Sequence, residues 1–439
     1  MASWRPLTRL SPTSSRPASS AIASRLRQPA TDPTMQTERP RQAVILAGGR
    51  GTRMRPLTDH RPKPMIEFHG KPFLAYIVEL LARQGFERVE MLLGYLPDVI
   101  TTYFGDGTGH GVEITYSISA PDDLTARRLQ LVEHRLDPLF LMLYCDNYWP
   151  LDMDRLWDRY RAVGAPAMTT IYANDDGYSR DNVRVSDGGL IELFDRSRSA
   201  PNLKGVEISY ALLPRSALSL LPADGAELVE QALYPELARE GKLGAHASGH
   251  RYYSVGSMHR LPLTDAFLAR RPAVILDRDG VLNERPPQAE YVRVPADFRW
   301  RDGSLDALRL LRDAGFLVIV VSNQAGVGRG LMSDDDVQAV NDTMRREAAA
   351  AGGHIDAVYY CPHDWNAGCT CRKPLPGMLF QAQREHHLDL SMTTFIGDDE
   401  RDGQAADAAG APYLHVDDAH DLIDHVQNLI AARRERDRP

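Results

Sequence analysis

Cysteine is scarce in this chain. Only four occur among 439 residues, and three of them, Cys361, Cys369 and Cys371, fall within one short stretch. A secreted disulfide framework is spaced differently, so the pattern excludes that class and favours a reducing compartment with a metal site. Long apolar runs are also missing, because none approaches the roughly eighteen residues that cross a bilayer. We therefore expect a cytoplasmic protein with no membrane partner.

An excess of positive charge is missing too. The chain has 51 Lys and Arg against 59 Asp and Glu, a formal net charge of −8. No basic stripe is available to displace counterions from a phosphate backbone, so we expect no nucleic-acid partner. The composition, 43% hydrophobic and 25% charged, is that of a globular protein. Because the length exceeds what one core usually holds, two domains are expected.

Residues 1–40 depart from the rest of the chain. They are rich in Arg, Ser, Pro and Ala, and Asp32 and Glu38 are their only acidic residues. They lack the apolar core of a secretory signal. An organellar transit peptide, a disordered tail, or a stretch upstream of a natural start at Met35 all fit this composition. We leave this extension out of the fold and predict domains at 41–260 and 273–435, joined by a linker at 261–272 that contains one or two helical turns.

Both predicted domains have an α/β pattern. In the first, strands are predicted at 42–47, 89–94 and 139–144, with a helix at 71–83. Strand–helix–strand units of this length imply right-handed crossovers and a parallel sheet. The pattern then restarts, with strands predicted at 273–276, 316–322 and 393–396 and a helix at 304–314. The fold class is therefore α/β with two doubly wound domains, and ligands are expected at the carboxyl ends of the strands.

Two carboxylates follow the first strand of the second domain. Asp277 is placed to attack phosphorus and form an aspartyl-phosphate, and Asp279 to protonate the leaving oxygen and then activate water. Gly280 lets the backbone turn away sharply. Ser322, at the end of the next strand, offers a hydroxyl to the phosphoryl oxygens, and Asn323 follows with a backbone amide. A D-x-D alone is often a solvated turn, so the ordered set carries the prediction of a phosphatase.

Further acidic and basic residues complete this predicted site. Asp398 and Asp399 follow another strand and are expected to hold Mg²⁺ together with Asp277. Lys373 supplies positive charge to the developing transition state. The sequence therefore predicts a magnesium-dependent phosphatase.

A compact set of metal-binding side chains precedes Lys373. Three thiols and one imidazole lie within eleven positions, a set that suits tetrahedral Zn²⁺. These residues are Cys361, His363, Cys369 and Cys371. The alternative is chance clustering of free thiols. We interpret the site as structural, pinning a loop so that Arg372 and Lys373 project into the active site.

The order D-x-D-G, Ser-Asn-Gln, Lys, Gly-Asp-Asp resembles the haloacid dehalogenase superfamily. Only about forty-five residues separate Asp277 from Ser322, which leaves no room for a large cap domain. The zinc loop is similar to that of D-glycero-D-manno-heptose 1,7-bisphosphate 7-phosphatases, with histidinol-phosphate phosphatases as close relatives. The resemblance implies that Asp277 is the nucleophile, that Asp279 is the acid/base and binds Mg²⁺ through its carbonyl, that Asp398 is a Mg²⁺ ligand, and that Arg372 lies near the second phosphate of the sugar.

A glycine-rich turn follows the first strand of the first domain. Its glycines let backbone amides approach a triphosphate. The residues expected to bind the nucleotide there are Gly48, Gly49, Gly51 and Thr52. Arg53, and Lys63 in the Arg61–Met65 run that follows, bring positive charge to the phosphates. Together the two elements resemble sugar-1-phosphate nucleotidyltransferases, in which the sugar phosphate attacks the α-phosphorus of a nucleoside triphosphate.

The same resemblance assigns further residues and shows departures. It implies that Asp146 binds Mg²⁺, and it places Asp195 and Arg196 where the family grips the sugar and its phosphate. The departures are Leu124 and Arg127 at family glycines, Cys145 at the glycine before the metal-binding Asp, and Ser254 at a second metal-binding Asp. A neutral hydroxyl is a poorer Mg²⁺ ligand than a carboxylate.

The two halves together predict a bifunctional enzyme acting on small sugar phosphates and a nucleoside triphosphate. The phosphatase would yield heptose 1-phosphate, and the other half would transfer a nucleotidyl group, by resemblance GMP, in lipopolysaccharide-type biosynthesis. Two alternatives stay open. One is a phosphatase with a catalytically inactive nucleotidyltransferase-like domain, and the other is a phosphatase for histidinol phosphate.

Overall fold

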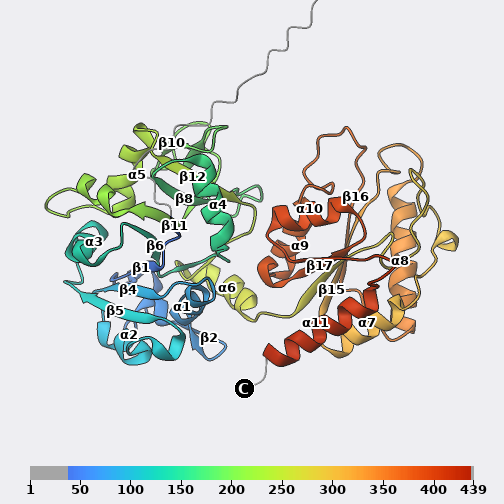
Figure 1. Ribbon diagram of the computed structural model, residues 1–439, viewed down its shortest axis with the longest axis horizontal. Helices are drawn as coiled ribbons and strands as arrows, with labels where there is room; N and C mark the ends of the chain where they lie inside the picture. The colour runs from blue at the N-terminus through green and yellow to red at the C-terminus, as the bar shows by residue number, and fades with distance from the viewer. Residues whose placement is uncertain (1–37, 437–439) are drawn as a thin grey trace, which may run out of the picture.

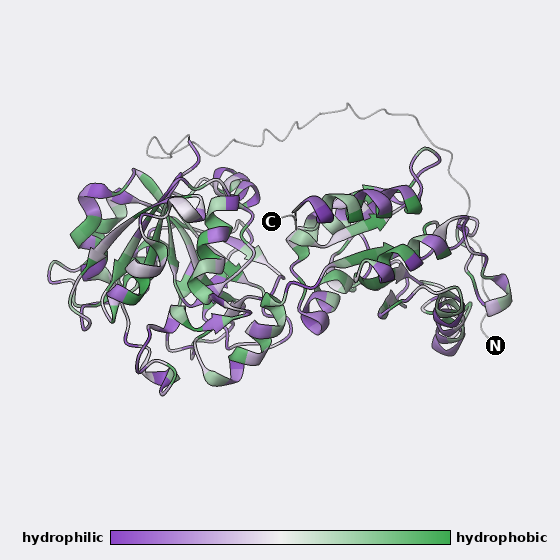
Figure 2. Cartoon of the chain, turned by 90° about the horizontal axis from the view of Figure 1, so that it is seen from below, coloured by the Kyte–Doolittle hydropathy of each residue, from purple (hydrophilic) through white to green (hydrophobic). Residues whose placement is uncertain are grey.

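The computed structural model describes residues 38–436, so the predictions for residues 1–37 lie outside the described residues. It contains two α/β units next to each other, with a short helix at their boundary (Figure 1). Hydrophobic residues concentrate along the strands of both units (Figure 2). Within the described residues, no helix combines the length and the apolar character that a membrane crossing requires.

The first unit is built on a seven-stranded sheet in the order β12-β8-β11-β6-β1-β4-β5. Its strands are β1 (Gln42–Ala47), β4 (Arg88–Leu93), β5 (Glu113–Ile118), β6 (Leu139–Tyr144), β8 (Ala167–Tyr172), β11 (Val206–Pro214) and β12 (Leu243–Ser248). Every pairing is parallel except those of β11, which runs antiparallel to β6 and β8. The sheet is therefore mixed, a feature that the strand pattern did not predict.

Helices cover both faces of this sheet. They are α1 (Phe73–Arg83), α2 (Pro97–Phe104), α3 (Thr125–Val132), α4 (Met153–Val163) and α5 (Val229–Arg239). Successive side chains of β1 alternate between the two cores, with Ala43 and Ile45 on one face and Val44 and Leu46 on the other. Helix α1 begins two residues later than predicted, because Pro72 holds an extended conformation before it.

The second unit contains a five-stranded parallel sheet in the order β16-β15-β14-β17-β18. Its strands are β14 (Ala273–Asp277), β15 (Leu317–Asn323), β16 (Ala357–Cys361), β17 (Thr394–Gly397) and β18 (Tyr413–His415). Its helices are α7 (Ser304–Asp313), α8 (Asp334–Ala350), α9 (Gly377–His386), α10 (Glu400–Ala409) and α11 (Leu422–Arg436). Helices α7, α8 and α11 cover one face and α9 and α10 the other. The predicted strands are present, each with its carboxyl end within one or two residues of the expected position.

The predicted linker is a packed helix. Helix α6 (Leu261–Leu268) buries Phe267 and Leu268 in the core of the first unit, and the Phe267 ring stacks on Tyr253 with the ring centroids 3.9 Å apart. Its two turns match the expected helical turns, but the segment belongs to the first unit. The chain passes to β14 only through residues 269–272.

Buried polar groups join the two units. Gln383 of α9 is fully buried and donates from Nε2 to the Tyr253 hydroxyl at 2.8 Å. The backbone N–H of Leu390 donates to Nε2 of His250 at 3.3 Å. Because buried polar atoms are costly unless they are paired, these contacts fix how the second unit docks on the first.

Candidate active sites

The first candidate site lies at the carboxyl ends of β14, β15 and β17. Asp277 ends β14, Ser322 lies next to the end of β15, and Asp398 directly follows β17. A cavity of about 650 Å³ opens there, lined by Asp277, Asp279, Ser322, Asn323, Arg372 and Lys373 together with residues 285–291. Parallel strands bring their carboxyl ends to one edge, which explains why distant residues of the sequence meet here.

Lys373 lies between two buried carboxylates. Its Nζ is 2.8 Å from Oδ1 of Asp277 and 2.7 Å from Oδ1 of Asp402. Burial raises the pKa of Asp277 well above its usual range; the Lys373 charge opposes this, and Asp402 reinforces it. The pKa of Lys373 is raised because these two carboxylates outweigh the effect of its burial. Lys373 therefore stays charged beside the Asp277 oxygen.

Asp279 is held by a network of donors. Its carboxylate accepts from Gln324 Nε2 at 2.7 Å and from Asn283 Nδ2 at 3.0 Å. Arg278, fully buried, pairs with it at 3.0 Å, and the Ser322 hydroxyl lies 3.5 Å away. The orientation of this carboxylate is thus set by partners from both β14 and β15.

The side chain of Asn323 bonds to the backbone of the Lys373 segment. Its Nδ2 donates to the carbonyl of Lys373, and its Oδ1 accepts from the Lys373 N–H, both at 3.1 Å. Although Asn323 lines the cavity, its side-chain amide is occupied by this backbone. Its role in the structure is to fix the strand end against the Lys373 segment.

The expectation that Asp399 binds metal is not supported. Asp399 is the N-cap of α10, where its side chain accepts from the Arg401 N–H, and it also pairs with Arg285 and Arg401. Its carboxylate is used by the helix end, and these two arginines hold its pKa far below the usual range. Asp402, one helical turn further on, takes its place.

Three carboxylates form the acidic group instead. Asp277, Asp398 and Asp402 each offer an oxygen within 4.8 Å of the others. Oδ1 of Asp398 is buried without a hydrogen-bond partner, and Oδ2 pairs with Arg285 at 3.2 Å. A buried carboxylate oxygen without a donor is the ligand that a hard divalent cation takes, so these residues fit the expected magnesium site.

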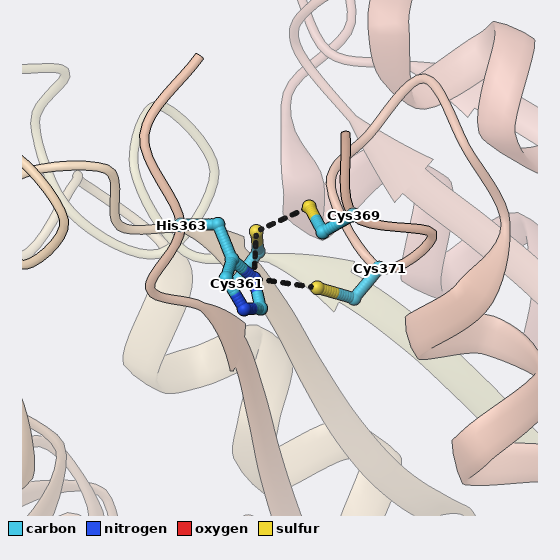
Figure 3. Close-up of side chains that lie close together, drawn as sticks. All are labelled: Cys361, His363, Cys369 and Cys371. Atoms are coloured by element: carbon cyan, nitrogen blue, oxygen red, sulfur yellow. Dashed lines mark hydrogen bonds between the residues drawn. The ribbon is translucent and has the colours of Figure 1, made fainter. Parts of the chain in front are cut away.

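The thiol cluster is assembled as predicted (Figure 3). Cys361 ends β16, and its Sγ lies 3.7 Å from that of Cys369. Nδ1 of His363 lies 3.2 Å from Sγ of Cys371 and 3.6 Å from Sγ of Cys361. With metal–sulfur bonds of about 2.3 Å, the sulfur atoms of a tetrahedral zinc site lie about 3.8 Å apart. The four side chains therefore fit one tetrahedral metal ion.

The second candidate site lies at the carboxyl end of β6. A cavity of about 500 Å³ is lined by Arg53, Asp146, Arg196, Ser254 and neighbouring residues. Lys63 pairs with Asp146. Ser254 lines the same cavity because β13 (Tyr253–Ser254) pairs with β7 (Asn147–Tyr148), which places Ser254 opposite Asn147. Burial raises the pKa of Glu207, another lining residue, to about 7.

An arginine of α3, Arg128, contacts the glycine-rich turn, and the sequence pattern did not single it out. Arg128 is buried, and its guanidinium donates to the carbonyl of Ala120 at 2.8 Å and to that of Gly48 at 3.4 Å. A Cβ atom on Gly48 would lie 2.2 Å from the Arg128 guanidinium carbon. Gly48 is thus required for Arg128 as much as for a phosphate, whereas Gly49 faces open space and Gly51 has a positive φ.

The structure places Asp195 away from this cavity. Asp195 accepts from the N–H groups of Ser197, Ser199 and Ala200, so its carboxylate organises its own turn. It is absent from the residues that line the cavity, whereas Arg196 is among them. Leu124 and Arg127 are both exposed and do not line this cavity either.

Two family models match this chain, one in each unit. Residues 42–181 match the family model for Nucleotidyl transferase, and residues 370–427 match that for HAD-hydrolase-like proteins. The D-glycero-β-D-manno-heptose-1,7-bisphosphate 7-phosphatase of Bordetella bronchiseptica is 42% identical over 142 residues, which are 32% of this chain and 78% of the relative. This decides the family. The chain belongs, through its C-terminal unit, to the heptose bisphosphate 7-phosphatases.

Two solved structures were also compared. The B. bronchiseptica D,D-heptose 1,7-bisphosphate phosphatase, complexed with magnesium and phosphate, is 34% identical; the match covers 37% of this chain and 99% of that chain with a TM-score of 0.35. HddC from Yersinia pseudotuberculosis is 18% identical and covers 51% of this chain and 97% of that chain with a TM-score of 0.43.

The 7-phosphatase unit is compact around its site. Between β14 and β15 the chain holds only a loop, a 3₁₀ turn and α7, so no cap domain is inserted there. Sequence reasoning missed Asp402, Arg278 and Arg285. The run of acidic residues after β17 was the available signal for Asp402, which lies in the first turn of α10, three residues after the N-cap Asp399.

Proposed function

We propose that the chain is a bifunctional enzyme of nucleotide-activated heptose synthesis. Its C-terminal unit would remove the 7-phosphate of D-glycero-D-manno-heptose 1,7-bisphosphate. Its N-terminal unit would transfer a nucleotidyl group, GMP by resemblance, from a nucleoside triphosphate to heptose 1-phosphate. The observation that carries this proposal is the Asp277–Lys373 pair at the end of β14, within a region 42% identical to a heptose bisphosphate phosphatase. We place the enzyme in the cytoplasm, where thiolate ligands stay reduced.

In the proposed hydrolysis, an oxygen of Asp277 attacks the phosphorus while the bond from phosphorus to the sugar oxygen breaks. Asp279 gives its proton to the departing oxygen and then takes one from the water that cleaves the aspartyl-phosphate, returning both carboxylates to their starting state. Lys373 and the Ser322 hydroxyl stabilise the phosphoryl oxygens. Arg372, which lines the cavity with a side-chain nitrogen buried and unpaired, binds the sugar's second phosphate.

Metal ions complete the proposal. Asp277 and Asp398, with the Asp279 carbonyl, would hold Mg²⁺, which supplies charge neutralisation between the nucleophile and the phosphate. The cluster around Cys361 would hold Zn²⁺ as a structural ion, since all four of its positions are taken by protein ligands. The zinc loop leads directly to Arg372 and Lys373, so it orients both side chains.

In the proposed transfer, Arg53 and Lys63 bind the triphosphate, and Asp146 would hold a second Mg²⁺. The glycine turn at residues 48–51 supplies backbone amides, and Arg196 binds the sugar phosphate. An oxygen of the sugar phosphate attacks the α-phosphorus, and pyrophosphate leaves.

The test is product analysis by mass spectrometry. Purified protein receives both anomers of heptose 1,7-bisphosphate, Mg²⁺ and the common nucleoside triphosphates in competition. We expect a nucleoside-diphosphate heptose, whose base identifies the donor. Free phosphate with heptose 1-phosphate alone would reject the transferase half. A higher kcat/KM for histidinol phosphate than for the heptose bisphosphate would reject the sugar assignment.

A second candidate is a phosphatase whose N-terminal unit only binds ligands. It is favoured by Ser254, a hydroxyl in the cavity that Asp146 lines, and by Arg128, whose guanidinium contacts the Gly48 carbonyl. In that case Arg53→Ala and Asp146→Ala leave every measurable activity unchanged.

A further inference from the structure

A separate cavity of about 360 Å³ lies at the junction of the two units. It is lined by the end of α1, by α6 and α9 with the segments that follow them, and by α11. The first residues of β14 and β17 and the residue before β15 complete the lining. It is therefore at the amino edge of the second sheet, the edge opposite to Asp277. Its volume falls within the roughly 300–1,000 Å³ of small-molecule sites.

Positive charge dominates the lining. Four arginines line it, Arg83, Arg270, Arg271 and Arg433, and the single carboxylate is Asp389. His386 and His387 line it too, but burial lowers the pKa of both, so they add no positive charge at neutral pH. Among the ion pairs of residues 38–436, none involves Arg83, Arg270 or Arg271. Like charges gathered in a partly buried site repel one another, so an anion bound there would be strongly favoured.

Two of these arginines are held in place with donors to spare. Arg83 and Arg270 both donate to the hydroxyl of Tyr148, at 3.4 and 3.3 Å. Nε of Arg270 is buried without an acceptor, and the backbone of Arg270 is in the left-handed region with φ 46°. A buried donor without a partner and a strained backbone are both expected where a ligand completes the site.

The remaining lining residues indicate what the rest of the ligand should be like. Phe316, Leu388 and Leu429 form an apolar wall, and the Arg433 guanidinium lies over the Phe316 ring at 5.4 Å. Oδ1 of Asp389 accepts from Ser391, whereas Oδ2 is buried without a donor. A buried carboxylate oxygen without a donor can accept a hydrogen bond from a hydroxyl group of a sugar.

We propose that this cavity binds a sugar-bearing phosphate, either a nucleotide or a sugar phosphate, at a site distinct from both active sites. The arginines bind the phosphate, Asp389 accepts from a sugar hydroxyl, and the apolar wall contacts the remaining surface. Tyr148 is on β7, the strand that directly follows Asp146, so two of the arginines that would bind the ligand also contact a segment next to the second candidate site.

Hydrogen–deuterium exchange on the full chain tests this directly, because it reports where a ligand acts. GDP, glucose 1-phosphate and inorganic phosphate are added separately. We expect GDP or glucose 1-phosphate to protect peptides covering 264–273 and 386–394. Arg271→Glu, at an exposed position, should weaken that binding at least tenfold. Arg309→Glu, at an exposed arginine of α7, is the matched control and should change nothing there.

Three outcomes would overturn the proposal. The first is protection confined to residues 46–63 and 277–285, around the active sites. The second is protection of 264–273 that Arg271→Glu leaves intact. The third is equal protection by inorganic phosphate at the same concentration, because Asp389 would then contribute nothing to recognition.

Discussion

The side chain of Asn323 holds the backbone of Lys373 through two hydrogen bonds, so we expect it to affect catalysis by positioning Lys373. Asn323→Ala removes both hydrogen bonds to the Lys373 backbone, each worth about 1 kcal/mol. We expect kcat for phosphate-ester hydrolysis to fall about tenfold to a hundredfold, with a smaller change in KM, because Lys373 shifts relative to Asp277. Steady-state kinetics measure both, and Gln404→Ala, at an exposed residue of α10, is the control. An unchanged kcat would show that Lys373 is positioned by other contacts.

Arg128 and Arg127 are neighbours with opposite surroundings. Arg128→Ala removes the hydrogen bonds to the carbonyls of Leu93 and Ala120, each worth about 1 kcal/mol, and leaves a cavity where the buried side chain was, although both carbonyls keep a backbone donor. We therefore expect a clear fall in the midpoint of thermal unfolding. Arg127→Ala, at an exposed position, should change the stability by less than about 0.5 kcal/mol. Equal shifts for both variants would contradict the structure.

The sequence predicted the residues that chemistry demands in a fixed order, namely Asp277, Lys373 and the thiol cluster. It could not predict which carboxylates near the start of a helix cap that helix and which remain available to bind a metal. Asp399 was expected to bind metal because it is adjacent to Asp398, yet the free N–H groups at the start of α10 take its side chain. Such competition depends on where the helix begins, and helix ends are poorly specified by sequence.

At the scale of elements, the start of α10 gives two adjacent carboxylates different roles: Asp399 caps the helix, and Asp398 is available to bind a metal. Asp399→Ser keeps a side chain that caps well, so the free energy of unfolding should change by only a few tenths of a kcal/mol and hydrolysis should persist. Asp398→Ser removes the carboxylate with the unpaired buried oxygen and should abolish hydrolysis without unfolding the protein. Thermal unfolding and a phosphate-release assay on both variants check this. Loss of activity in both would return Asp399 to the metal site.

The strands of the second unit were readable from sequence because a parallel sheet covered on both faces needs nearly continuous apolar runs, as in β15. Strand β11 was not, since its antiparallel direction depends on distant pairing with β6 and β8. The packing of α6 was hidden for the same reason. The helix has only eight residues, too few for a clear helical period, and the partners of its apolar side chains lie elsewhere in the chain.

At the scale of the whole molecule, His250 links docking of the two units to pH. Its Nε2 accepts from the Leu390 N–H and its Nδ1 donates to the Arg251 carbonyl at 2.8 Å, so the docked ring is neutral. Burial lowers the pKa of His250, while Asp389 opposes and Arg251 reinforces this shift. Unfolded histidine takes up a proton as the pH falls through about 6.5, so stability is full above that value and is lost below it.

We therefore expect the free energy of unfolding to decrease between pH 7 and pH 5, and His250→Gln to reduce that dependence. Urea unfolding at several pH values measures it, with the exposed His259→Gln as control. Burial also lowers the pKa of His246, to about 4, so part of the slope should survive in the His250 variant. If the free energy of unfolding of His250→Gln depends on pH as steeply as that of the unaltered protein, His250 does not cause the pH dependence.

The packing of α6 also decides where this gene can be divided. A break before codon 261 would send Phe267 and Leu268 with the phosphatase, away from the core that covers them, and would open a hole beside Tyr253 in the other product. Both products would then expose apolar surface to water and tend to aggregate. A break after codon 269 leaves each core whole. The boundary between the two units is therefore only about four residues long, and two separately expressed units should keep their cores only if the chain is divided within it.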